Sequence, residues 1–356
     1  MRQFLYDIIA IMTIIVEKVK KMRVVLIPGD GIGKEIADSV KKVAEVLKCD
    51  IEWMEYEAGA EYFEKSGKLM QDGLLDKIEE VKVALKGPTA TPIGKGFRSI
   101  NVYLRQRFNT YANIRPVSNM KGLKGRYKNV DLIVIRENSE DLYKGVEYMY
   151  DENTAHGVKI ISRDASDRII RYAFEYACKN NRKKVTCVHK ANIMKMTDGL
   201  FLDEFNKIKE EYPDIESNDV IIDALCMKLV TDPTVFDVLV APNLYGDIIS
   251  DLCAGLVGGL GFAPSANIGD EVRIYEAVHG SAPDIAGQNK ANPTAILLAF
   301  AMLLNDNGME DKADILKKTI NDIIAEGKYA TADMGGSSST DEYTRVLMER
   351  ISNETV

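Results

Sequence analysis

The sequence has little of what builds disulfide frameworks or histidine metal sites. It contains five cysteines, with no C-x-x-C pair among them, and three histidines in 356 residues. Scattered cysteines of this kind predict neither a disulfide-stapled protein nor a zinc site. They are typical of a reducing cytosol, so we expect a cytoplasmic protein.

An excess of positive charge is also missing. The net charge is -8, so we expect no nucleic-acid partner. Long hydrophobic runs are lacking too: the apolar stretch of residues 4–16 is short for a membrane span, and Asp7 interrupts it. No small-residue cleavage site follows. We therefore interpret residues 1–21 as an N-terminal extension rather than a membrane anchor, with Met22 as a candidate start.

Short apolar runs alternate with amphipathic stretches along the chain. The runs are continuous rather than alternating, which predicts an α/β protein whose sheet is covered on both faces. The expected strands are 23–27, 81–85, 130–135, 184–188, 219–223 and 236–240. The expected helices are 34–47, 164–179, 198–210, 294–306, 311–326 and 340–351. The polar stretch 148–159 is expected to protrude as a loop or hairpin.

A glycine loop, PGDGIG at residues 28–33, follows the first expected strand. The dinucleotide-binding fingerprint is G-x-G-x-x-G, and here the third glycine comes one residue early. We interpret Gly29, Gly31 and Gly33 as a tight strand-to-helix turn that needs glycine backbone freedom, not as a phosphate cradle.

Three aspartates form a candidate metal site. Asp247 and Asp251 are four residues apart, so a helix would present them on one face. Asp223 ends the apolar run VIIDA, and strand ends carry site residues in α/β proteins. Such carboxylates suit Mg²⁺ or Mn²⁺. The alternative is that they are merely solvated.

Arginines gather around residues 95–136 of this acidic chain. Their planar guanidinium binds carboxylate or phosphate bidentately, which favours a small polyanionic ligand such as a phosphate ester or a polycarboxylic acid. Tyr143 and Lys190 are candidate acid–base residues, although a surface role is the more common one for such a lysine. The basic residues are Lys95, Arg98, Arg105, Arg107, Arg115 and Arg136.

Taken together, the motifs resemble those of the decarboxylating β-hydroxyacid dehydrogenases, the isocitrate, homoisocitrate and 3-isopropylmalate dehydrogenases. The likeness runs from residue 22 to about 350 and is strongest to NAD-dependent isocitrate dehydrogenases. The motifs, in order, are PGDGIG (28–33), RSINVYLR (98–105), YANIRPV (111–117), IRENSEDLY (135–143), VHKANIMK (188–195), NLYGDIISD (243–251), GGLGFAPSANIG (258–269) and HGSAPDIAGQNKANP (279–293).

This resemblance implies a fold that is not Rossmann. A large domain is formed by residues 22–110 and 255–356, and a small central domain by residues 111–254. A clasp at about 141–162 pairs two protomers into a homodimer, or into part of a higher oligomer, whose active sites are shared. One protomer then supplies the substrate-binding residues Arg105, Arg115 and Arg136, the catalytic Tyr143, and the metal ligands Asp247 and Asp251. The partner supplies the catalytic Lys190 and the third metal ligand, Asp223.

The resemblance also bears on the substrate. In isocitrate enzymes a serine and an asparagine meet the extra carboxylate, and Ser99 and Asn101 stand at those positions. Isopropylmalate enzymes have an apolar surface there, and typically REL where this chain has REN at 136–138. Alternatively, Ser99 is a helix cap and Asn101 a surface residue.

For the cofactor, the resemblance implies NAD. Asp284 and Ile285 stand where NADP-dependent members carry lysine and tyrosine. A carboxylate accepts hydrogen bonds from ribose hydroxyls and would repel a 2′-phosphate. The alternative for Asp284 is a helix or turn cap. Other matching positions are Thr91, Asn192, His279, Gly280 and Asn292.

The function implied is oxidative decarboxylation of isocitrate to 2-oxoglutarate and CO₂, with NAD and Mg²⁺ or Mn²⁺. Alternatives within the family are homoisocitrate and 3-isopropylmalate dehydrogenases. An alternative of another class is a non-catalytic regulatory chain of a heteromeric isocitrate dehydrogenase. The presence of Tyr143, Lys190 and all three aspartates argues against that last alternative.

Overall fold

The computed structural model describes residues 21–91, 99–123 and 125–354. The N-terminal extension (apart from Lys21), Lys95 and Arg98 lie outside the described residues. Within them, no helix has both the length and the apolar character to cross a membrane.

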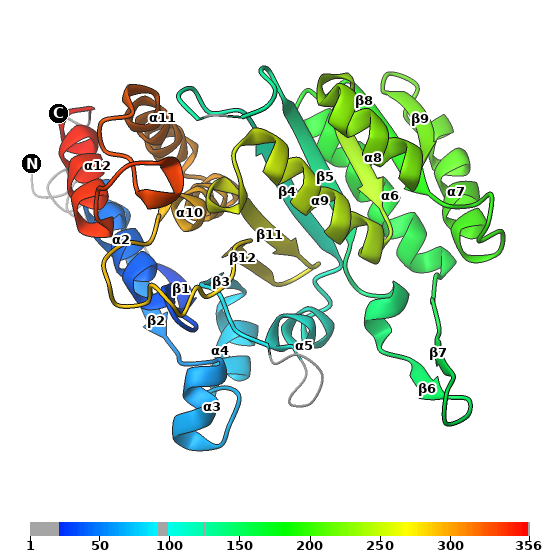
Figure 1. Cartoon of the computed structure of the whole chain (residues 1–356), viewed down its shortest axis with the longest axis horizontal. Coiled ribbons are helices and arrows are strands. Elements are labelled where there is room, and N and C mark those ends of the chain that lie inside the picture. The colour runs from blue at the N-terminus through cyan, green and yellow to red at the C-terminus, as the bar shows by residue number, and fades with distance from the viewer. Residues whose placement is uncertain (1–20, 92–98, 124, 355–356) are drawn as a thin grey trace, which may run out of the picture.

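A ten-stranded sheet runs through the whole molecule (Figure 1). Its central pairs, β12–β11, β11–β4 and β4–β5, are antiparallel, and the others are parallel. This mixed order confirms the predicted α/β fold and differs from the Rossmann sheet. The order is β2 (Ile51–Glu55), β1 (Met22–Ile27), β3 (Val83–Lys86), β12 (Arg273–Ala277), β11 (Pro264–Ile268), β4 (Ala112–Ser118), β5 (Asp131–Glu137), β10 (Val238–Ala241), β8 (Lys184–His189) and β9 (Glu216–Ile221).

Helices cover both faces of this sheet, as the continuous apolar strands predict. On one face lie α2 (Gly33–Val46), α6 (Arg163–Lys179), α7 (Thr197–Ile208) and α10 (Thr294–Asp306). On this side α11 (Glu310–Glu326) packs on α10, and α12 (Thr340–Glu354) packs on α2 and α11. The other face, which we call the site face, packs against α4 (Leu74–Val81), α5 (Ile100–Arg107), α8 (Ile222–Thr231) and α9 (Asn243–Val257). The small helix α3 (Ala60–Ser66) follows β2.

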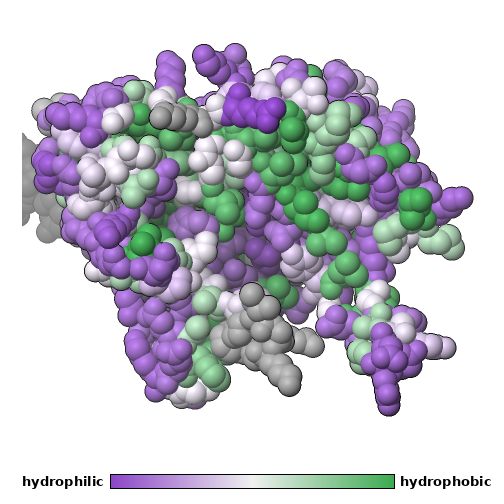
Figure 2. Space-filling model, viewed as in Figure 1, coloured by the Kyte–Doolittle hydropathy of each residue, from purple (hydrophilic) through white to green (hydrophobic). Residues whose placement is uncertain are grey.

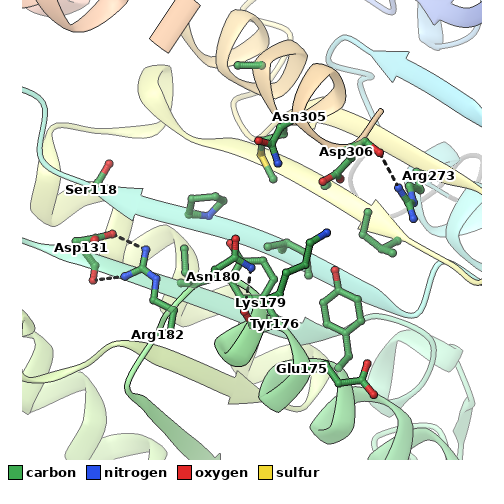
Figure 3. Close-up of a pocket in the computed structure, with 18 of the residues that line it drawn as sticks. Ser118, Asp131, Glu175, Tyr176, Lys179, Asn180, Arg182, Arg273, Asn305 and Asp306 are labelled. Atoms are coloured by element: carbon green, nitrogen blue, oxygen red, sulfur yellow. Dashed lines mark hydrogen bonds and ion pairs between the residues drawn. The ribbon is translucent and has the colours of Figure 1, made fainter. Parts of the chain in front are cut away.

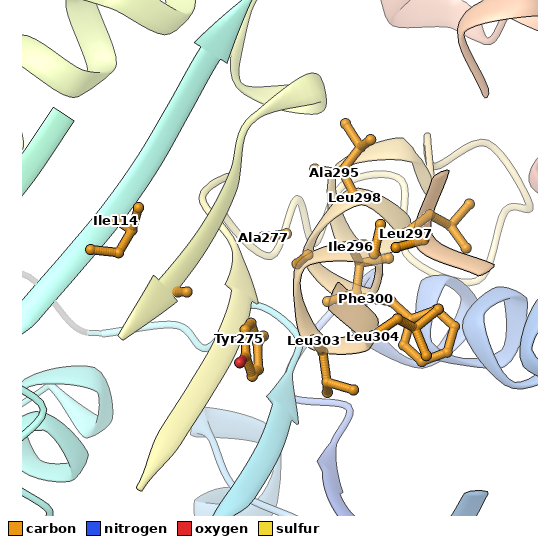
Figure 4. Close-up of a cluster of buried hydrophobic side chains, with 14 of the residues drawn as sticks. Ile114, Tyr275, Ala277, Ala295, Ile296, Leu297, Leu298, Phe300, Leu303 and Leu304 are labelled. Carbon is orange, nitrogen blue, oxygen red and sulfur yellow. The ribbon is translucent and has the colours of Figure 1, made fainter. Parts of the chain in front are cut away.

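Helix α10 is the centre of the main core (Figure 4). Its sequence, TAILLAFAMLLND, is apolar on nearly every side, which is typical of a helix buried all round. Leu297, Phe300 and Leu304 are fully buried there, and Tyr275 of β12 lies beside the helix. This core packs against the face of the sheet opposite the site face, and so fixes the strands that carry the site residues.

The predicted strand 219–223 is wrong at its end. Strand β9 stops at Ile221 and α8 begins at Ile222. Asp223 therefore lies in the first turn of a helix rather than at the end of a strand. The end of the strand was mispredicted because the apolar run continues from the strand directly into the helix, where Leu225 is fully buried.

The polar stretch 148–159 contains a hairpin, as expected. Strands β6 (Glu147–Met149) and β7 (Ala155–Gly157) pair antiparallel, and every residue in them is exposed. The hairpin projects from the body of the molecule (Figure 1). The use of this hairpin as a clasp between two protomers stays a prediction. The division into two domains also stays a prediction, and the sheet continues without a break from β11 to β4.

Candidate active site

Asp247 is the centre of a cluster of charged side chains on the site face. Arg136, which is buried at the end of β5, forms an ion pair with Asp247. The second oxygen of Asp247 accepts a hydrogen bond of 2.5 Å from the hydroxyl of Tyr143. Burial alone would raise the pKa of Asp247, but Arg136, Tyr143 and Arg115 outweigh it and lower that pKa. Asp247 is therefore ionised at neutral pH.

Arg115 joins the two aspartates of α9. Its guanidinium lies 3.3 Å from Asp247 and 3.0 Å from Asp251, which places both carboxylates on one face of the helix, as their spacing predicts. Burial raises the pKa of Asp251, and Arg115 opposes the rise.

Arg136 is fixed from several sides. Its Nε and Nη2 donate to Asn243 at 3.0 and 2.8 Å, and its guanidinium carbon lies 4.9 Å from the centre of the Tyr143 ring. Burial, together with the neighbouring Arg105, lowers the pKa of Arg136 to about 10. It still carries its charge at neutral pH, so the cluster keeps a strong attraction for anions.

Helix α5 brings a third arginine. Arg105 is buried and donates to Glu276 at 3.2 Å. Its Nε is buried and has no hydrogen-bond partner among the described residues. A buried guanidinium nitrogen without a partner is costly, so it marks a place where a ligand acceptor fits. Gln106, the next residue, donates to the carbonyl of Tyr143 at 3.4 Å, which ties this helix to the tyrosine segment.

Ser99 and Asn101 lie at the start of the same helix. Ser99 is the N-cap residue, but its side chain makes no capping hydrogen bond. Asn101 is half-buried and accepts a hydrogen bond of 3.0 Å from Thr89. The cap alternative for Ser99 thus lacks its hydrogen bond, while the substrate role of both residues stays a prediction.

Lys190 and Asp223 form an ion pair of their own, and Lys190 lowers the pKa of Asp223. No group of three acidic, cysteine or histidine side chains that could hold a metal occurs in the described residues. One described chain thus pairs Asp247 with Asp251 but does not bring Asp223 to them. The predicted supply of Lys190 and Asp223 by a partner stays a prediction.

The glycine loop is a tight turn packed on backbone. Gly31 has a φ of +60°, and a side chain there would come within 2.0 Å of the carbonyl oxygen of Ser281. Gly29 is equally close to Pro88. Asp30 is buried and accepts hydrogen bonds from three backbone amides. The loop therefore braces the predicted cofactor loop, residues 279–293, rather than forming an open phosphate cradle.

The predicted cofactor residues lie on and around that loop. His279 donates from Nδ1 to the carbonyl of Gly280 at 3.0 Å, and its buried Nε2 has no partner among the described residues. Asp284 is exposed, and its carboxylate makes no hydrogen bond in the described structure, so it caps no turn there. Ile285 packs against the core. Thr91 and Asn192 are exposed, and Asn292 is buried and donates to Asp333 at 2.9 Å.

A cavity of about 540 Å³ opens on the opposite face of the sheet, between α6 and α10 (Figure 3). Its floor includes Ile114 and Pro116, and its wall includes Tyr172 and Tyr176. No predicted site residue lines it. On β4 the residues alternate, so Ile114 faces this cavity while Arg115 faces the aspartates.

Sequence reasoning missed several buried polar residues that hold the cluster. They are single polar residues within strands, directly after a strand or at a helix start, and no spacing rule marks them. The residues are Lys86, Asn113, Asn138, Asn243, Asn267 and Glu276. Asp198 was missed too. It is fully buried, pairs with Lys159 at 2.5 Å and accepts the backbone N–H of Lys190 at 2.7 Å.

Comparison with known proteins places the chain in a family. A family model described as isocitrate/isopropylmalate dehydrogenase matches residues 23–347. The chain belongs to this family of dehydrogenases. The predicted likeness to NAD-dependent isocitrate dehydrogenases is confirmed.

Three relatives illustrate the range within the family. The NAD isocitrate dehydrogenase catalytic subunit 5 of Arabidopsis thaliana is 52% identical and covers 92% of this chain and 87% of its own length. A regulatory subunit of the NAD isocitrate dehydrogenase of Dictyostelium discoideum is 50% identical, with coverage of 93% and 92%. The chloroplastic 3-isopropylmalate dehydrogenase of Solanum tuberosum is 51% identical, with coverage of 86% and 86%. Identity therefore does not separate catalytic chains, regulatory chains and isopropylmalate enzymes.

Among solved structures, isocitrate dehydrogenase from Methylococcus capsulatus superposes with a TM-score of 0.90. It is 45% identical and covers 93% of this chain and 99% of its own. The mixed ten-stranded sheet is thus a fold already seen in an isocitrate dehydrogenase.

The predicted cytoplasmic location is contradicted by the relatives. The Arabidopsis and Dictyostelium isocitrate dehydrogenase chains are named mitochondrial. All five cysteines are free, as predicted, but free thiols occur in any reducing compartment. Cysteine usage therefore could not distinguish one such compartment from another.

Proposed function

We propose that this chain is a catalytic NAD-dependent isocitrate dehydrogenase, which converts isocitrate to 2-oxoglutarate and CO₂ with Mg²⁺ or Mn²⁺. The observation that carries the proposal is the cluster of Arg115, Arg136 and Tyr143 around Asp247 and Asp251 on the site face. It combines a site for several carboxylates with carboxylate ligands for a cation and a proton donor.

The arginines form the substrate clamp. Isocitrate carries three carboxylates, and Arg105, Arg115 and Arg136 are three buried cations on one face of the sheet. Together with Lys86 these arginines are four cations, and the carboxylates paired with them are three, Asp247, Asp251 and Glu276. The positive excess favours a polyanion. Ser99 and Asn101, at the start of α5, would meet the third carboxylate and thereby favour isocitrate over isopropylmalate.

A divalent cation fits the two aspartates of α9. Their carboxylate oxygens are the ligands that Mg²⁺ and Mn²⁺ prefer. Asp247 and Asp251 would hold it together with Asp223 of a second copy. When bound, the cation polarises the ketone formed at C2 and so favours loss of CO₂.

NAD fits the loop of residues 279–293. The buried, unpartnered Nε2 of His279 offers an acceptor there, and the exposed carboxylate of Asp284 suits ribose hydroxyls. When bound, NAD accepts the hydride from C2. Asp284 would disfavour the additional phosphate of NADP because two negative charges would then face each other.

Two residues move protons. Lys190 of a second copy accepts the proton of the C2 hydroxyl as the hydride leaves. Tyr143 returns a proton to C3 after CO₂ departs. Burial and the hydrogen bond to Asp247 raise the pKa of Tyr143, so its hydroxyl keeps its proton at neutral pH and is available as an acid.

Exposed apolar residues support a homodimer. On α8, Met227 and Val230 follow Asp223 at helical spacing, and they are 58% and 39% exposed. On α9, Ile248 lies one turn before Asp251 and is 52% exposed. Figure 2 shows a hydrophobic band over α9 on this face. A second copy that covers this surface would bury the apolar residues next to the metal ligands of both chains.

The test is a measurement of NADH formation by the purified chain with isocitrate and Mn²⁺. The same assay with NADP, homoisocitrate and 3-isopropylmalate ranks the alternatives by kcat/KM. Activity that needs a second, different chain would replace the proposal with a regulatory role. Preference for 3-isopropylmalate would replace it with that enzyme.

A further inference from the structure

A chain of buried hydrogen bonds runs beneath the site across three strands. Arg115 donates from Nε to Asn113 at 2.9 Å, and Asn113 donates to Asn267 at 2.9 Å. Asn267 donates to Glu276 at 2.7 Å, and Glu276 also accepts from Arg105 at 3.2 Å. Two substrate-binding arginines are thus joined through three side chains that contribute no group to the proposed chemistry.

Glu276 determines which group donates and which accepts in each of these hydrogen bonds. It is almost fully buried and is paired with Lys86 at 2.9 Å. As an ionised carboxylate it only accepts hydrogen bonds, so the amide of Asn267 must turn its NH₂ group toward it. The oxygen of Asn267 then accepts from Asn113, which leaves the oxygen of Asn113 for Arg115. Each bond strengthens the next, because aligned donors polarise one another.

Asn267 is the central member and is fully satisfied. Its oxygen accepts from Asn113 and Asn138, at 2.9 and 3.0 Å. Its nitrogen donates to Glu276 and to the carbonyl of Ile274, at 2.7 and 3.3 Å. Asn267 is 2% exposed, and burying a polar side chain costs free energy that an apolar side chain at the same position would not. A fully paired asparagine at this depth therefore fixes orientation as well as packing.

The row of buried hydrogen bonds also crosses from strand β11 to strand β4. Asn267 lies on β11 and Asn113 on the antiparallel neighbour β4, in direct register. Arg105 lies on α5, Glu276 on β12, and Asn113 and Arg115 on β4. The two arginines thus lie on different elements, and the buried hydrogen bonds link those elements through side chains.

We infer that Asn267 is a positioning residue, which holds Arg105 and Arg115 in a fixed relation through Glu276 and Asn113, so that both engage one polycarboxylate. This inference deepens the proposed function and rests on it for the identity of the substrate. It assigns to Asn267 no contact with substrate or cofactor.

The test uses Asn267→Asp in the full chain. The substitution keeps size and the acceptor for Asn113, but it replaces the donor to Glu276 with a second carboxylate. We expect KM for isocitrate to rise about tenfold or more, while KM for NAD stays within about twofold of the control. The control is Asn321→Asp. Asn321 lies on α11, and its one side-chain hydrogen bond among the described residues is to the backbone carbonyl of Lys317 in the same helix.

Two further measurements keep the outcome decisive. In the double variant Asn267→Asp with Glu276→Gln, the new amide at position 276 can donate to the new carboxylate at position 267, so the bond between the two positions is restored in the reverse direction. This variant should recover part of the lost isocitrate affinity. If Asn267→Asp does not fold, Asn267→Ser replaces it in the same assays. Equal rises of KM for isocitrate and NAD, or no rise, overturn the inference.

A crystal structure of the variant without substrate separates this inference from the proposed function. Displacement of Arg105 or Arg115 supports the positioning role, and unchanged arginines refute it, whether or not the wild-type chain oxidises isocitrate. Absence of isocitrate activity in the wild type refutes the proposed function alone.

Discussion

Replacing Tyr143 with phenylalanine removes one hydroxyl from the centre of the site. The aromatic ring remains, so its contact with the Arg136 guanidinium, 4.9 Å from the ring centre, is kept. Asp247 loses one hydrogen bond of 2.5 Å but keeps Arg136 and Arg115 as partners. The loss in stability should therefore be small, about 1 kcal/mol, since charged partners still satisfy the carboxylate.

The loss in turnover should be much larger. A positioned general acid contributes roughly 10²- to 10⁴-fold to rate, so kcat should fall by about 100-fold or more. Binding of NAD should not change, because the predicted NAD loop lies on another segment of the chain. The proton donor is the neutral phenol, and its pKa is raised. Its protonated form is therefore fully present at neutral pH and disappears only in strongly alkaline solution.

Two assays separate these effects. Isocitrate oxidation is followed by NADH formation, and decarboxylation is followed with the oxidised β-keto acid supplied directly. Tyr143→Phe should impair the second reaction at least as strongly as the first. Tyr176→Phe, which removes a hydroxyl on the opposite face of the sheet, is the matched control. Intact decarboxylation, or an equal loss of NAD affinity, would remove Tyr143 from the role of acid.

Three other changes test the remaining parts of the site. Asp284→Lys combined with Ile285→Tyr should shift the NADP/NAD ratio of kcat/KM by about tenfold or more, equivalent to about 1.4 kcal/mol; an unchanged ratio contradicts the assignment. Arg136→Lys loses the fork that bonds Asn243, so KM for isocitrate should rise about tenfold; an unchanged KM in steady-state assays would exclude the clamp role. Lys86 and Arg105 outweigh the effect of burial and lower the pKa of Glu276, so its pairing stabilises the fold above the ordinary glutamate pKa and is lost as the pH falls below it. Urea unfolding between neutral pH and about pH 3 should therefore show a shallower acid loss for Glu276→Gln than for the wild type; parallel curves would contradict this.

Many regular elements were predictable from their apolar residues, which form an amphipathic pattern in most helices and continuous runs in strands covered on both faces. The six predicted helices all occur. In α2, for example, Ile36, Val40 and Val43 are buried at helical spacing. Strand β4 escaped detection because its buried residues include Asn113 and Arg115. Polar residues inside a strand break the apolar run on which strand prediction depends, and here they do so because the strand carries the site.

The predicted site shows the same limit. Asp247 and Asp251 could be paired from sequence because a helix turns at a fixed period, and the structure pairs them through Arg115. Asp223 could not be placed by any local rule. Its predicted place beside the other two rests on the proposed second copy, and the described residues of one chain show only the exposed apolar side chains of Met227 and Val230 near it.

Long-range packing explains the glycine loop. The loop of Gly29, Gly31 and Gly33 is as rich in glycine as a dinucleotide-binding turn, but its contacts with the backbone of distant residues show that it forms a packed turn. Gly31 has no space for a side chain because the backbone of Ser281 lies against it, and Ile32 donates to the same carbonyl at 2.9 Å. Nearby, Glu35 accepts backbone hydrogen bonds from Asn289 and Ala291, at 3.3 and 3.2 Å. The glycines thus hold in place a loop some 250 residues later in the chain, and a substitution at Gly31 should weaken NAD binding through that loop without removing any atom that touches the cofactor.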